Sequence, residues 1–409
     1  MNFHNPHKQP DRQINIAFFE NGIGLGGAVT CLAALIRSLD PARFRAIVLS
    51  SHDDAPTRRV IEDAGAEFLL VRQYRRSERL EALSRTFGGN NPLRYPLLLL
   101  ILCYESLRRL WYGFRAWRVL ARHQVNLVHL NNSLAGNLEG ILAAKLQRVK
   151  CVQHLRGYEY NSLESRLAAR WVTCFIAVSK SVADSLIPLG VPRERIRVIY
   201  DGIDFEESVA KSVEPLAAGT FESDNFKIGL VGSLIPWKGQ RVFVEAAAIL
   251  INDMKMRDTR FFLIGDTVPG GEDYRRELEQ LAAAANISDH LVFVGHQDNV
   301  YKFLTRLDLV VHASILPEPF GRVIIEAMAL ARPVIATSMG GPLEIIEHGR
   351  DGLLVRAGDP RSLAESVYEL LTNSDQRRLM ASAAKRKVAT QFTLSRFAQE
   401  LELLYASLN

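Results

Sequence analysis

Residues 308–355, DLVVHASILPEPFGRVIIEAMALARPVIATSMGGPLEIIEHGRDGLLV, decide the fold of this chain. An apolar strand at 309–311 runs into a turn with two prolines, and we expect a helix to open at residue 319 or 320 and to continue through 331. The next buried strand is expected at 333–337, and a glycine pair at 340–341 opens a second helix. Two helix N-termini then meet at the carboxyl end of one parallel sheet, where open α/β sheets bind ligands.

The first of these helix starts has the composition of a phosphate site. Because Gly321 has no side chain, the N–H groups of Phe320 and Gly321 can approach an anion, which the helix dipole favours. Glu318 precedes the helix and Glu326 lies about two turns along it, so one carboxylate can face a reacting centre while the other takes the paired hydroxyls of a ribose. The alternative is that Glu318 is a solvated loop acid and that Glu326 pairs with Arg322.

Length and composition indicate a soluble two-domain protein. A chain of 409 residues is too long for one ordinary hydrophobic core. Its composition, 48% hydrophobic and 23% charged residues, is sufficient for two hydrophobic cores. The four cysteines, at 31, 103, 151 and 174, show no CxxC pairing or metal spacing, which indicates buried thiols in a reducing compartment. Residues 1–13 are polar, so we expect no secretory signal and a cytoplasmic location.

The first half alternates strands and helices in a doubly wound pattern. A strand at 14–19 is followed by the glycines of GIGLGG at 22–27 and by a helix over 28–39. This GxGxxG spacing has two interpretations: a fingerprint for a nicotinamide or flavin dinucleotide, or a tight strand-to-helix turn. Further strands are expected at 46–49, 67–71, 125–130, 151–155, 174–178 and 196–200.

The predicted boundaries divide the chain into four parts. Residues 1–205 form an N-terminal Rossmann-like domain, and residues 206–225, polar and without periodicity, form a linker. A second Rossmann-like domain occupies 226–390. The helix in 391–409 has an apolar stripe that can pack back on the first domain.

A basic and apolar insertion at about 72–122 interrupts the first domain. It holds 11 arginines against three acids, and its apolar run at 95–104 is too short to cross a bilayer. Arginine mixed with tryptophan and tyrosine favours contact with an anionic membrane surface. Two alternatives are that the run packs inside the first domain beneath a solvated arginine face, and that the stretch binds nucleic acid. We do not expect nucleic acid as a partner, because no RNA- or DNA-binding signature accompanies the stretch.

Several strand ends carry polar candidates. Lys238, between a proline and a glycine at a helix start, can neutralise a diphosphate, although a surface turn is the simpler explanation. Gly265 and His296 each follow a later strand at the same sheet edge, where a base and ribose would lie. His154 ends a strand of the first domain, where a lone histidine is usually a structural hydrogen-bonding group but would here face a cleft between the domains.

Together these motifs resemble the retaining glycosyltransferases of family 4, which have the GT-B fold: two Rossmann-like domains facing across a cleft. The resemblance covers nearly the whole chain and is weakest over 72–117. It implies His154 and Glu318 as catalytic residues beside the transferred sugar. It implies a donor-binding set of Gly26, Gly27, Ser233, Lys238, Gly265, His296, Phe320, Gly321 and Glu326.

One position departs from the family pattern. The family commonly pairs its lysine with an arginine where this chain has Ser233, so one cation for the diphosphate is absent. Arg241 or Arg156 can replace it, or the affinity for the donor is lower.

The resulting hypothesis is a peripheral enzyme on the inner face of a membrane. It would move a sugar from a UDP- or GDP-sugar to a hydroxyl of a lipid-linked or growing glycan, with retention of configuration and without cofactor or metal, because lysine and helix N-termini stabilise the leaving diphosphate. Two alternatives stay open: a nucleotide-sugar epimerase on the same fold, and a nucleotide-binding scaffold without turnover.

Overall fold

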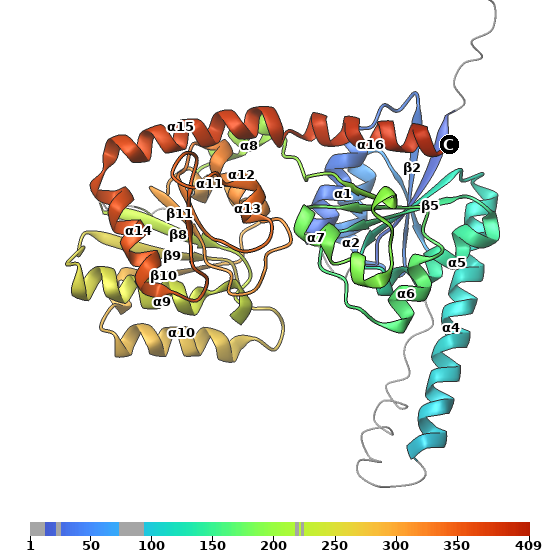
Figure 1. Ribbon diagram of the computed structural model, residues 1–409, viewed down its shortest axis with the longest axis horizontal. Helices are drawn as coiled ribbons and strands as arrows, with labels where there is room; N and C mark the ends of the chain where they lie inside the picture. The colour runs from blue at the N-terminus through green and yellow to red at the C-terminus, as the bar shows by residue number, and fades with distance from the viewer. Residues whose placement is uncertain (1–12, 22–25, 73–93, 217–220, 222–224) are drawn as a thin grey trace, which may run out of the picture. The chain divides into compact units, whose positions relative to one another are not determined.

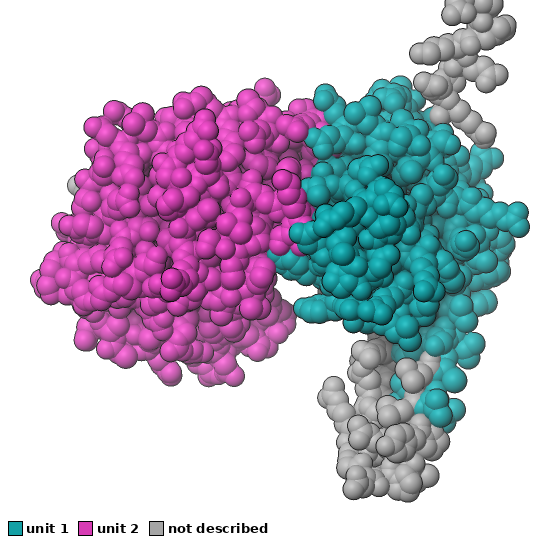
Figure 2. All heavy atoms as spheres, viewed as in Figure 1, with its two compact units in different colours: residues 1–178, 182–199, 398–409 teal, residues 179–181, 200–397 magenta. Residues whose placement is uncertain are grey.

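The computed structural model describes residues 13–21, 26–72, 94–216, 221 and 225–409, with the side chains of 94–98 and 102 excepted. Two compact units make up the chain (Figure 2): unit 1 comprises residues 1–178, 182–199 and 398–409, and unit 2 comprises 179–181 and 200–397. The first glycines of the predicted GxGxxG turn, Gly22 and Gly24, lie outside the described residues, as does much of the basic insertion.

Unit 1 is built on a parallel sheet of seven strands in its described part, in the order β3-β2-β1-β4-β5-β6-β7 (Figure 1). Continuous apolar runs make its central strands, because both faces of the sheet are covered by helices. The strands are β1 (Ile14–Phe19), β2 (Phe44–Ser50), β3 (Glu67–Leu70), β4 (Leu127–Asn132), β5 (Lys150–Leu155), β6 (Cys174–Ala177) and β7 (Ile196–Val198). The helices between them are α1 (Gly27–Ser38), α2 (Ala55–Asp63), α4 (Arg94–Arg122), α5 (Leu138–Gln147), α6 (Leu163–Ala169) and α7 (Lys180–Asp184).

Unit 2 has a second parallel sheet, of six strands in the described residues, in the order β10-β9-β8-β11-β12-β13. The strands are β8 (Phe226–Val231), β9 (Thr259–Ile264), β10 (Leu291–Gly295), β11 (Leu309–His312), β12 (Val334–Thr337) and β13 (Leu353–Val355). The helices are α8 (Phe205–Ser212), α9 (Gln240–Ala248), α10 (Glu272–Ala284), α11 (Tyr301–Leu304), α12 (Arg322–Ala329), α13 (Pro342–Ile345), α14 (Pro360–Thr372) and α15 (Ser374–Gln391). Both sheets have the doubly wound topology expected from the sequence.

The C-terminal helix α16 (Leu394–Leu408) packs against unit 1 through its last turns, as the sequence predicts. Leu401 and Tyr405 are fully buried, and the Tyr405 hydroxyl lies 2.8 Å from Nδ1 of His129 on β4. The backbone N–H of Asp40 donates to the Glu402 carboxylate at 2.9 Å. The apolar stripe is therefore supported by polar contacts at its edges.

The segment expected as a linker contains a helix. Unit 2 already begins at Tyr200, and α8 occupies Phe205–Ser212. The Asp204 side chain accepts a hydrogen bond from the Glu207 N–H at 2.9 Å, and Glu206 and Glu207 lie in the first turn, where the helix dipole favours negative charge. The expected linker therefore contains a short helix with a capped start. The helix was not predicted because the segment shows no apolar periodicity.

Helix α12 also differs from expectation, since it begins at Arg322 rather than at residue 319 or 320, and ends at Ala329. Gly321 is its N-cap and has φ +98°, in the left-handed region that favours glycine. This turn breaks the helical path before Arg322, so the amide of Phe320 precedes the helix rather than forming part of its first turn.

Helix α4 contains part of the apolar run of the basic insertion, and the exposure of its side chains tests whether that part packs inside unit 1. Leu99 and Leu100 are 62% and 65% exposed, so these two side chains do not pack inside unit 1. Cys103 is also exposed, whereas the other cysteines are buried as expected. Within the described ranges, no helix is both long and apolar enough to span a bilayer.

Candidate functional site

The carboxyl end of the unit 2 sheet brings several glycine turns close together. A Cβ on Gly265, which follows β9, would lie 2.1 Å from the carbonyl oxygen of Gly232, which follows β8. The Gly265 N–H donates to the Gly295 carbonyl at 2.9 Å. A Cβ on Gly239 would lie 1.9 Å from the Ala313 carbonyl oxygen. The ends of four neighbouring strands therefore approach backbone to backbone, which larger residues would prevent.

Glu318 is the centre of a buried polar cluster at this edge. Its Oε2 atom accepts hydrogen bonds from the ammonium of Lys238 at 2.7 Å and from the Ser314 hydroxyl at 3.0 Å, and lies 3.1 Å from Nε2 of His312. Glu318 is 8% exposed, so it is not the solvated loop acid of the alternative interpretation. The structure thus joins Lys238 and Glu318, two of the predicted site residues, in one ion pair.

The surroundings keep the Glu318 carboxylate ionised. Burial raises its pKa, but the hydrogen bond and charge of His312 and the charge of Lys238 outweigh burial and lower the pKa to about 2. A carboxyl group with such a pKa is an anion near neutral pH. Chemically it can accept hydrogen bonds from hydroxyl groups or balance a cation, but it cannot supply a proton as a general acid.

Sequence reasoning did not identify His312 and Ser314 as partners of Glu318. Both are buried at the end of β11, where residues two apart point to the same side of a strand. Ser314 is also held through its carbonyl, which accepts from the Thr337 hydroxyl at 2.8 Å. The available sequence signal was the pair of polar residues His312 and Ser314, two positions apart and just before Glu318.

The loop carrying Phe320 and Gly321 packs against the predicted second glycine turn. The Gly341 N–H donates to the Glu318 carbonyl at 2.8 Å, and a Cβ on Gly341 would lie 2.3 Å from the Phe320 carbonyl oxygen. Phe320 is buried and stacks on Tyr200 with ring centroids 6.0 Å apart. Helix α13, which follows Gly341, has a single turn of four residues.

Glu326 makes the intrahelical pair that the alternative interpretation predicts. Its Oε1 atom accepts from the Arg322 guanidinium at 3.2 Å, and its side chain is 13% exposed. The charge of Glu326 contributes, after burial, to raising the pKa of Tyr301. The pair with Arg322 fixes the carboxylate on α12, while its expected contact with a ribose stays a prediction.

The remaining donor-site candidates of unit 2 follow other strands of the sheet. Ser233 is exposed after β8, and its carbonyl accepts from the Gln240 side chain at 2.8 Å. His296 is exposed after β10 and lies 3.3 Å from Asp298. Arg241, a suggested substitute for the absent arginine, forms ion pairs with Glu245 at 3.0 Å and Glu277 at 2.6 Å. Its guanidinium is therefore already neutralised.

In unit 1, His154 is fully buried on β5, edge-on to His129 with ring centroids 5.3 Å apart. Burial first, and then the charges of Arg156 and His129, lower the pKa of His154 well below its ordinary value. A neutral imidazole results. As observed, His154 is a core side chain rather than one facing solvent, and its role in catalysis stays a prediction from the resemblance.

A polar cluster that sequence reasoning missed lies at the carboxyl edge of the unit 1 sheet. Buried Glu20, after β1, accepts from the side chains of Asn131 at 2.5 Å and Asn132 at 2.9 Å, and Arg156 donates to Asn131 at 2.9 Å. Polar residues ending adjacent strands were the available signal. Arg156, the other suggested substitute cation, belongs to this cluster.

Gly26 and Gly27 open helix α1 next to the same sheet edge. Gly26 is the N-cap of α1, and a Cβ on either glycine would have nothing within 4 Å among the described residues. Both residues are exposed. The amides at this helix start are therefore accessible to a ligand.

Comparison with known proteins places this geometry in a family. The family model described as glycosyl transferases group 1 matches residues 216–387, and that described as glycosyltransferase family 4 matches residues 25–207. The D-inositol 3-phosphate glycosyltransferase of Corynebacterium urealyticum is 34% identical over 309 residues, which are 72% of this chain and 69% of that protein. The N-acetyl-alpha-D-glucosaminyl L-malate synthase of Bacillus anthracis is 28% identical over 299 residues, 70% of this chain and 76% of that protein.

The crystal structure of Anabaena HepE in complex with UDP and glucose matches at 25% identity with a TM-score of 0.76, covering 97% of this chain and all of that one. Two parallel-sheet units of this kind, with their strand ends gathered into glycine turns, have the GT-B fold. The chain belongs to the group 1 glycosyltransferases, with the family 4 type of N-terminal domain.

Proposed function

We propose that this glycosyltransferase moves a sugar from a nucleotide diphosphate sugar to a hydroxyl of a lipid-linked or growing glycan, with retention of configuration. The observation that carries the proposal is the ion pair of Lys238 and buried Glu318 at the carboxyl edge of the unit 2 sheet. It places a cation within hydrogen-bond distance of a carboxylate that is ionised near neutral pH. A pyrophosphate leaving group needs the first, and a sugar hydroxyl can donate to the second.

The two members of the pair have distinct roles in the proposal. Lys238 is 23% exposed on its side chain and lies over the Trp237 ring at 4.2 Å, so it is accessible yet held in place. The donor diphosphate competes with Glu318 for this ammonium group. Glu318 then retains His312 and Ser314 as partners while it accepts a hydrogen bond from the transferred sugar.

The rest of the donor is assigned to the surrounding strand ends. The amides at Phe320 and Gly321 contact the phosphate or sugar, and the Glu326 carboxylate takes the ribose hydroxyls. The base lies near Gly265 and His296. The crystal structure of HepE with UDP and glucose supports a uridine donor as the first to test. For unit 1, the family resemblance assigns Gly26 and Gly27 to the diphosphate and His154 to the transferred sugar, and these roles remain predictions.

Charge stabilisation in this proposal comes from Lys238 and backbone amides, and not from a divalent metal. Among the described residues, no group of three or more His, Cys, Asp or Glu side chains suits a metal ion. The proposal therefore predicts that transfer continues in the presence of a chelator such as EDTA. Restoration of lost activity by Mg²⁺ or Mn²⁺ would contradict it.

The acceptor side rests on helix α4. Its exposed Leu99 and Leu100 give the described part of the basic insertion an apolar surface. The helix also carries arginines, of which Arg108 and Arg109 pair with Glu105 and Glu164. Such a surface suits peripheral contact with an anionic membrane, where lipid-linked acceptors are found. We therefore place the enzyme at the inner face of a membrane.

Incubation of the purified chain with radiolabelled UDP- and GDP-sugars and a membrane extract tests the proposal. Label in a lipid or glycan supports transfer, and the anomeric coupling constant of the new linkage shows whether configuration is retained. A changed free donor would instead indicate an epimerase, and no conversion would indicate a non-catalytic scaffold. Full transfer by Lys238→Ala or Glu326→Ala would contradict the site assignment.

A further inference from the structure

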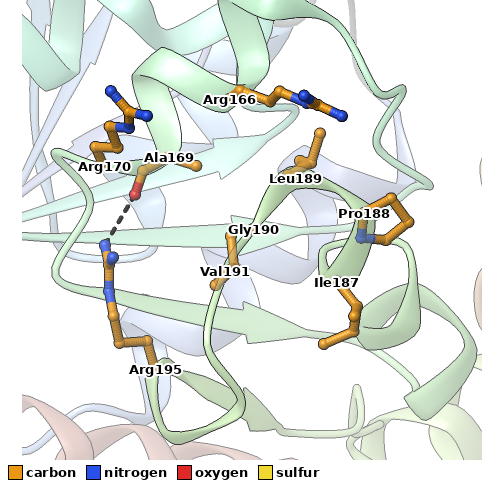
Figure 3. A pocket seen from close by; sticks show the side chains of 9 residues that line it. All are labelled: Arg166, Ala169, Arg170, Ile187, Pro188, Leu189, Gly190, Val191 and Arg195. Carbon is orange, nitrogen blue, oxygen red and sulfur yellow. Dashed lines mark hydrogen bonds between the residues drawn. The ribbon is translucent and has the colours of Figure 1, made fainter.

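A cavity of about 360 Å³ in unit 1 is lined by three arginines and no carboxylate (Figure 3). Arg166 and Arg170 come from α6 and its C-cap, and Arg195 directly precedes β7. Figure 3 shows Arg195 reaching the carbonyl of Ala169, to which it donates at 2.8 Å. Leu189 and Gly190 form part of the opposite wall. We call this the arginine cavity.

The charges of the arginine cavity are uncompensated in the described residues. Arg166 donates to the neutral Asn161 side chain at 2.8 Å, and within the described part of the chain Arg170 has neither a side-chain hydrogen bond nor an ion pair. Arg166 and Arg170 are four positions apart, a spacing at which like charges on a helix repel. An anion in the cavity would relieve this repulsion, and guanidinium groups bind phosphate well.

A second cavity, of about 550 Å³, lies between α4, α5 and α6 and shares Arg170 with the first. Most of its lining is apolar, including Leu110, Leu138, Leu142, Leu167 and Trp171. Two carboxylates, Glu139 and Glu164, also line it, and both pair with Arg109, at 3.8 Å and 2.5 Å. We call it the apolar groove. The exposed fractions of Leu110, Leu167 and Trp171 are 55%, 50% and 53%, which is unusual for side chains of this size gathered in one place.

Helix α4 extends the apolar groove with an exposed stripe. Leu99, Leu100, Leu107, Leu110 and Trp111 are all more than half exposed, at 62%, 65%, 66%, 55% and 52%. The spacing of residues 100, 107, 110 and 111 places them on one side of the helix. Figure 1 shows the first half of α4 extending past the rest of unit 1.

The arginine cavity is not explained by the sugar-transfer site. Arg195 directly precedes β7 and Arg170 shortly precedes β6, so this cavity lies at the amino edge of the unit 1 sheet. Doubly wound sheets bind their substrates at the other, carboxyl edge. The apolar groove extends from Arg170 to Leu138, which follows β4. A cationic cavity that opens beside an apolar groove matches a different ligand, one with an anionic head and an apolar chain.

We propose that this surface binds an anionic membrane lipid, with the lipid phosphate in the arginine cavity and an acyl chain in the apolar groove. Arg170 lines both cavities and marks the junction of head and chain. The inference deepens the proposed function, because it supplies a specific site for the membrane contact assigned above to α4. It names phospholipid as the occupant and does not depend on which glycan is the acceptor.

Sedimentation of the full-length chain with lipid vesicles tests the inference. Vesicles of phosphatidylcholine with phosphatidylglycerol should bind the wild type roughly tenfold or more tightly than vesicles of phosphatidylcholine alone. The double variant Arg166→Ala/Arg170→Ala should lose most of this preference. The control Arg193→Ala/Arg378→Ala removes two charges at side chains that are 80% and 77% exposed and should keep it. Equal binding by wild type and the first variant would overturn the proposal.

Two further measurements separate the parts of the proposal. Leu167→Ser should weaken binding to the anionic vesicles several-fold, because it removes an apolar contact with the chain. Inorganic phosphate at constant ionic strength should leave the vesicle complex intact. Displacement by phosphate alone, or no effect of Leu167→Ser, would show that the cavity takes a free anion and would overturn the lipid assignment.

Calorimetric titration with UDP keeps this inference distinct from the proposed function. Wild type and Arg166→Ala/Arg170→Ala should bind UDP equally, which also shows that the variant is folded. If UDP binds and both proteins sediment alike, the lipid site fails alone. If UDP binds to neither while only the wild type sediments with anionic vesicles, the lipid site stands and the donor assignment fails.

Discussion

The ammonium nitrogen of Lys238 lies 2.7 Å from Oε2 of Glu318, although the two residues are 80 positions apart in the chain. One follows the first strand of unit 2 and the other follows the fourth, and the pairing of β8 with β11 brings their loops together. The cation that we assign to the diphosphate is thereby held beside the carboxylate that we assign to the transferred sugar.

Replacing Lys238 by alanine should lower kcat/KM for sugar transfer by about a hundredfold, because the leaving diphosphate loses a preorganised charge. Steady-state kinetics with labelled donor measures this. Lys385→Ala is the matched control, since Lys385 also lies over an aromatic ring, that of Phe205 at 5.4 Å, and should change kcat/KM little. Comparable losses in both variants would indicate a general effect of removing a lysine rather than a role for Lys238.

Glu318→Gln should make unit 2 less stable near neutral pH, and this difference should shrink in acid. The folded-state pKa of Glu318 is about 2, below the ordinary value of 4.5. Its carboxylate therefore contributes stability above pH 4.5, and that contribution is lost as the pH falls towards 2. Urea denaturation of wild type and variant across this range measures the difference. A difference that does not depend on pH would contradict the assignment.

Gly265→Ala should destabilise unit 2 and weaken UDP binding. Its φ is +140°, and the new Cβ would lie 2.1 Å from the Gly232 carbonyl oxygen, so the strand ends must separate. Gly270→Ala is the control, because Gly270 also has a positive φ, +83°, but nothing within 4 Å of the new Cβ. The control should cost about 1–2 kcal/mol in free energy of unfolding and leave UDP affinity unchanged. Calorimetric titration measures the UDP affinity of both variants. If Gly265→Ala bound UDP as tightly as Gly270→Ala, the carboxyl edge of the unit 2 sheet would not be the UDP site.

Tyr405→Phe should lower the free energy of unfolding of unit 1 by about 1–3 kcal/mol, because it removes the hydroxyl next to His129 in a buried setting. The two groups lie 2.8 Å apart, and burial, followed by the charge of Arg156, lowers the pKa of His129 to about 3. Tyr368, 41% exposed, provides the control variant Tyr368→Phe, which should change stability by less than about 0.5 kcal/mol. Urea denaturation compares them, and equal midpoints would mean that α16 is not held by this contact.

Much of the fold is predictable from the sequence, because buried parallel strands are continuous apolar runs bounded by glycine and polar residues. The strand at Ile14–Phe19 has the expected bounds. Helix α8 was missed because it is short and polar, and its start is marked by the Asp204 cap rather than by an apolar run. The start of α12 was misplaced because the left-handed Gly321 turn depends on backbone geometry that composition does not show.

The sequence indicates which strand-end residues belong to the candidate site, but it does not show which of them contact one another. Lys238 and Glu318 were identified from their local motifs, yet their pairing depends on strand order, which local patterns do not give. His312 and Ser314 stand within an ordinary apolar strand end, and their importance emerges only from contact with Glu318. Burial of His154 likewise follows from packing in the completed sheet.

The most direct test of the central claim is a crystal structure of the chain with bound UDP. The account predicts the diphosphate within hydrogen-bond distance of the Lys238 ammonium and the ribose hydroxyls at the Glu326 carboxylate. UDP bound at another edge of the sheet, or at this edge with Lys238 making no phosphate contact, would contradict the account.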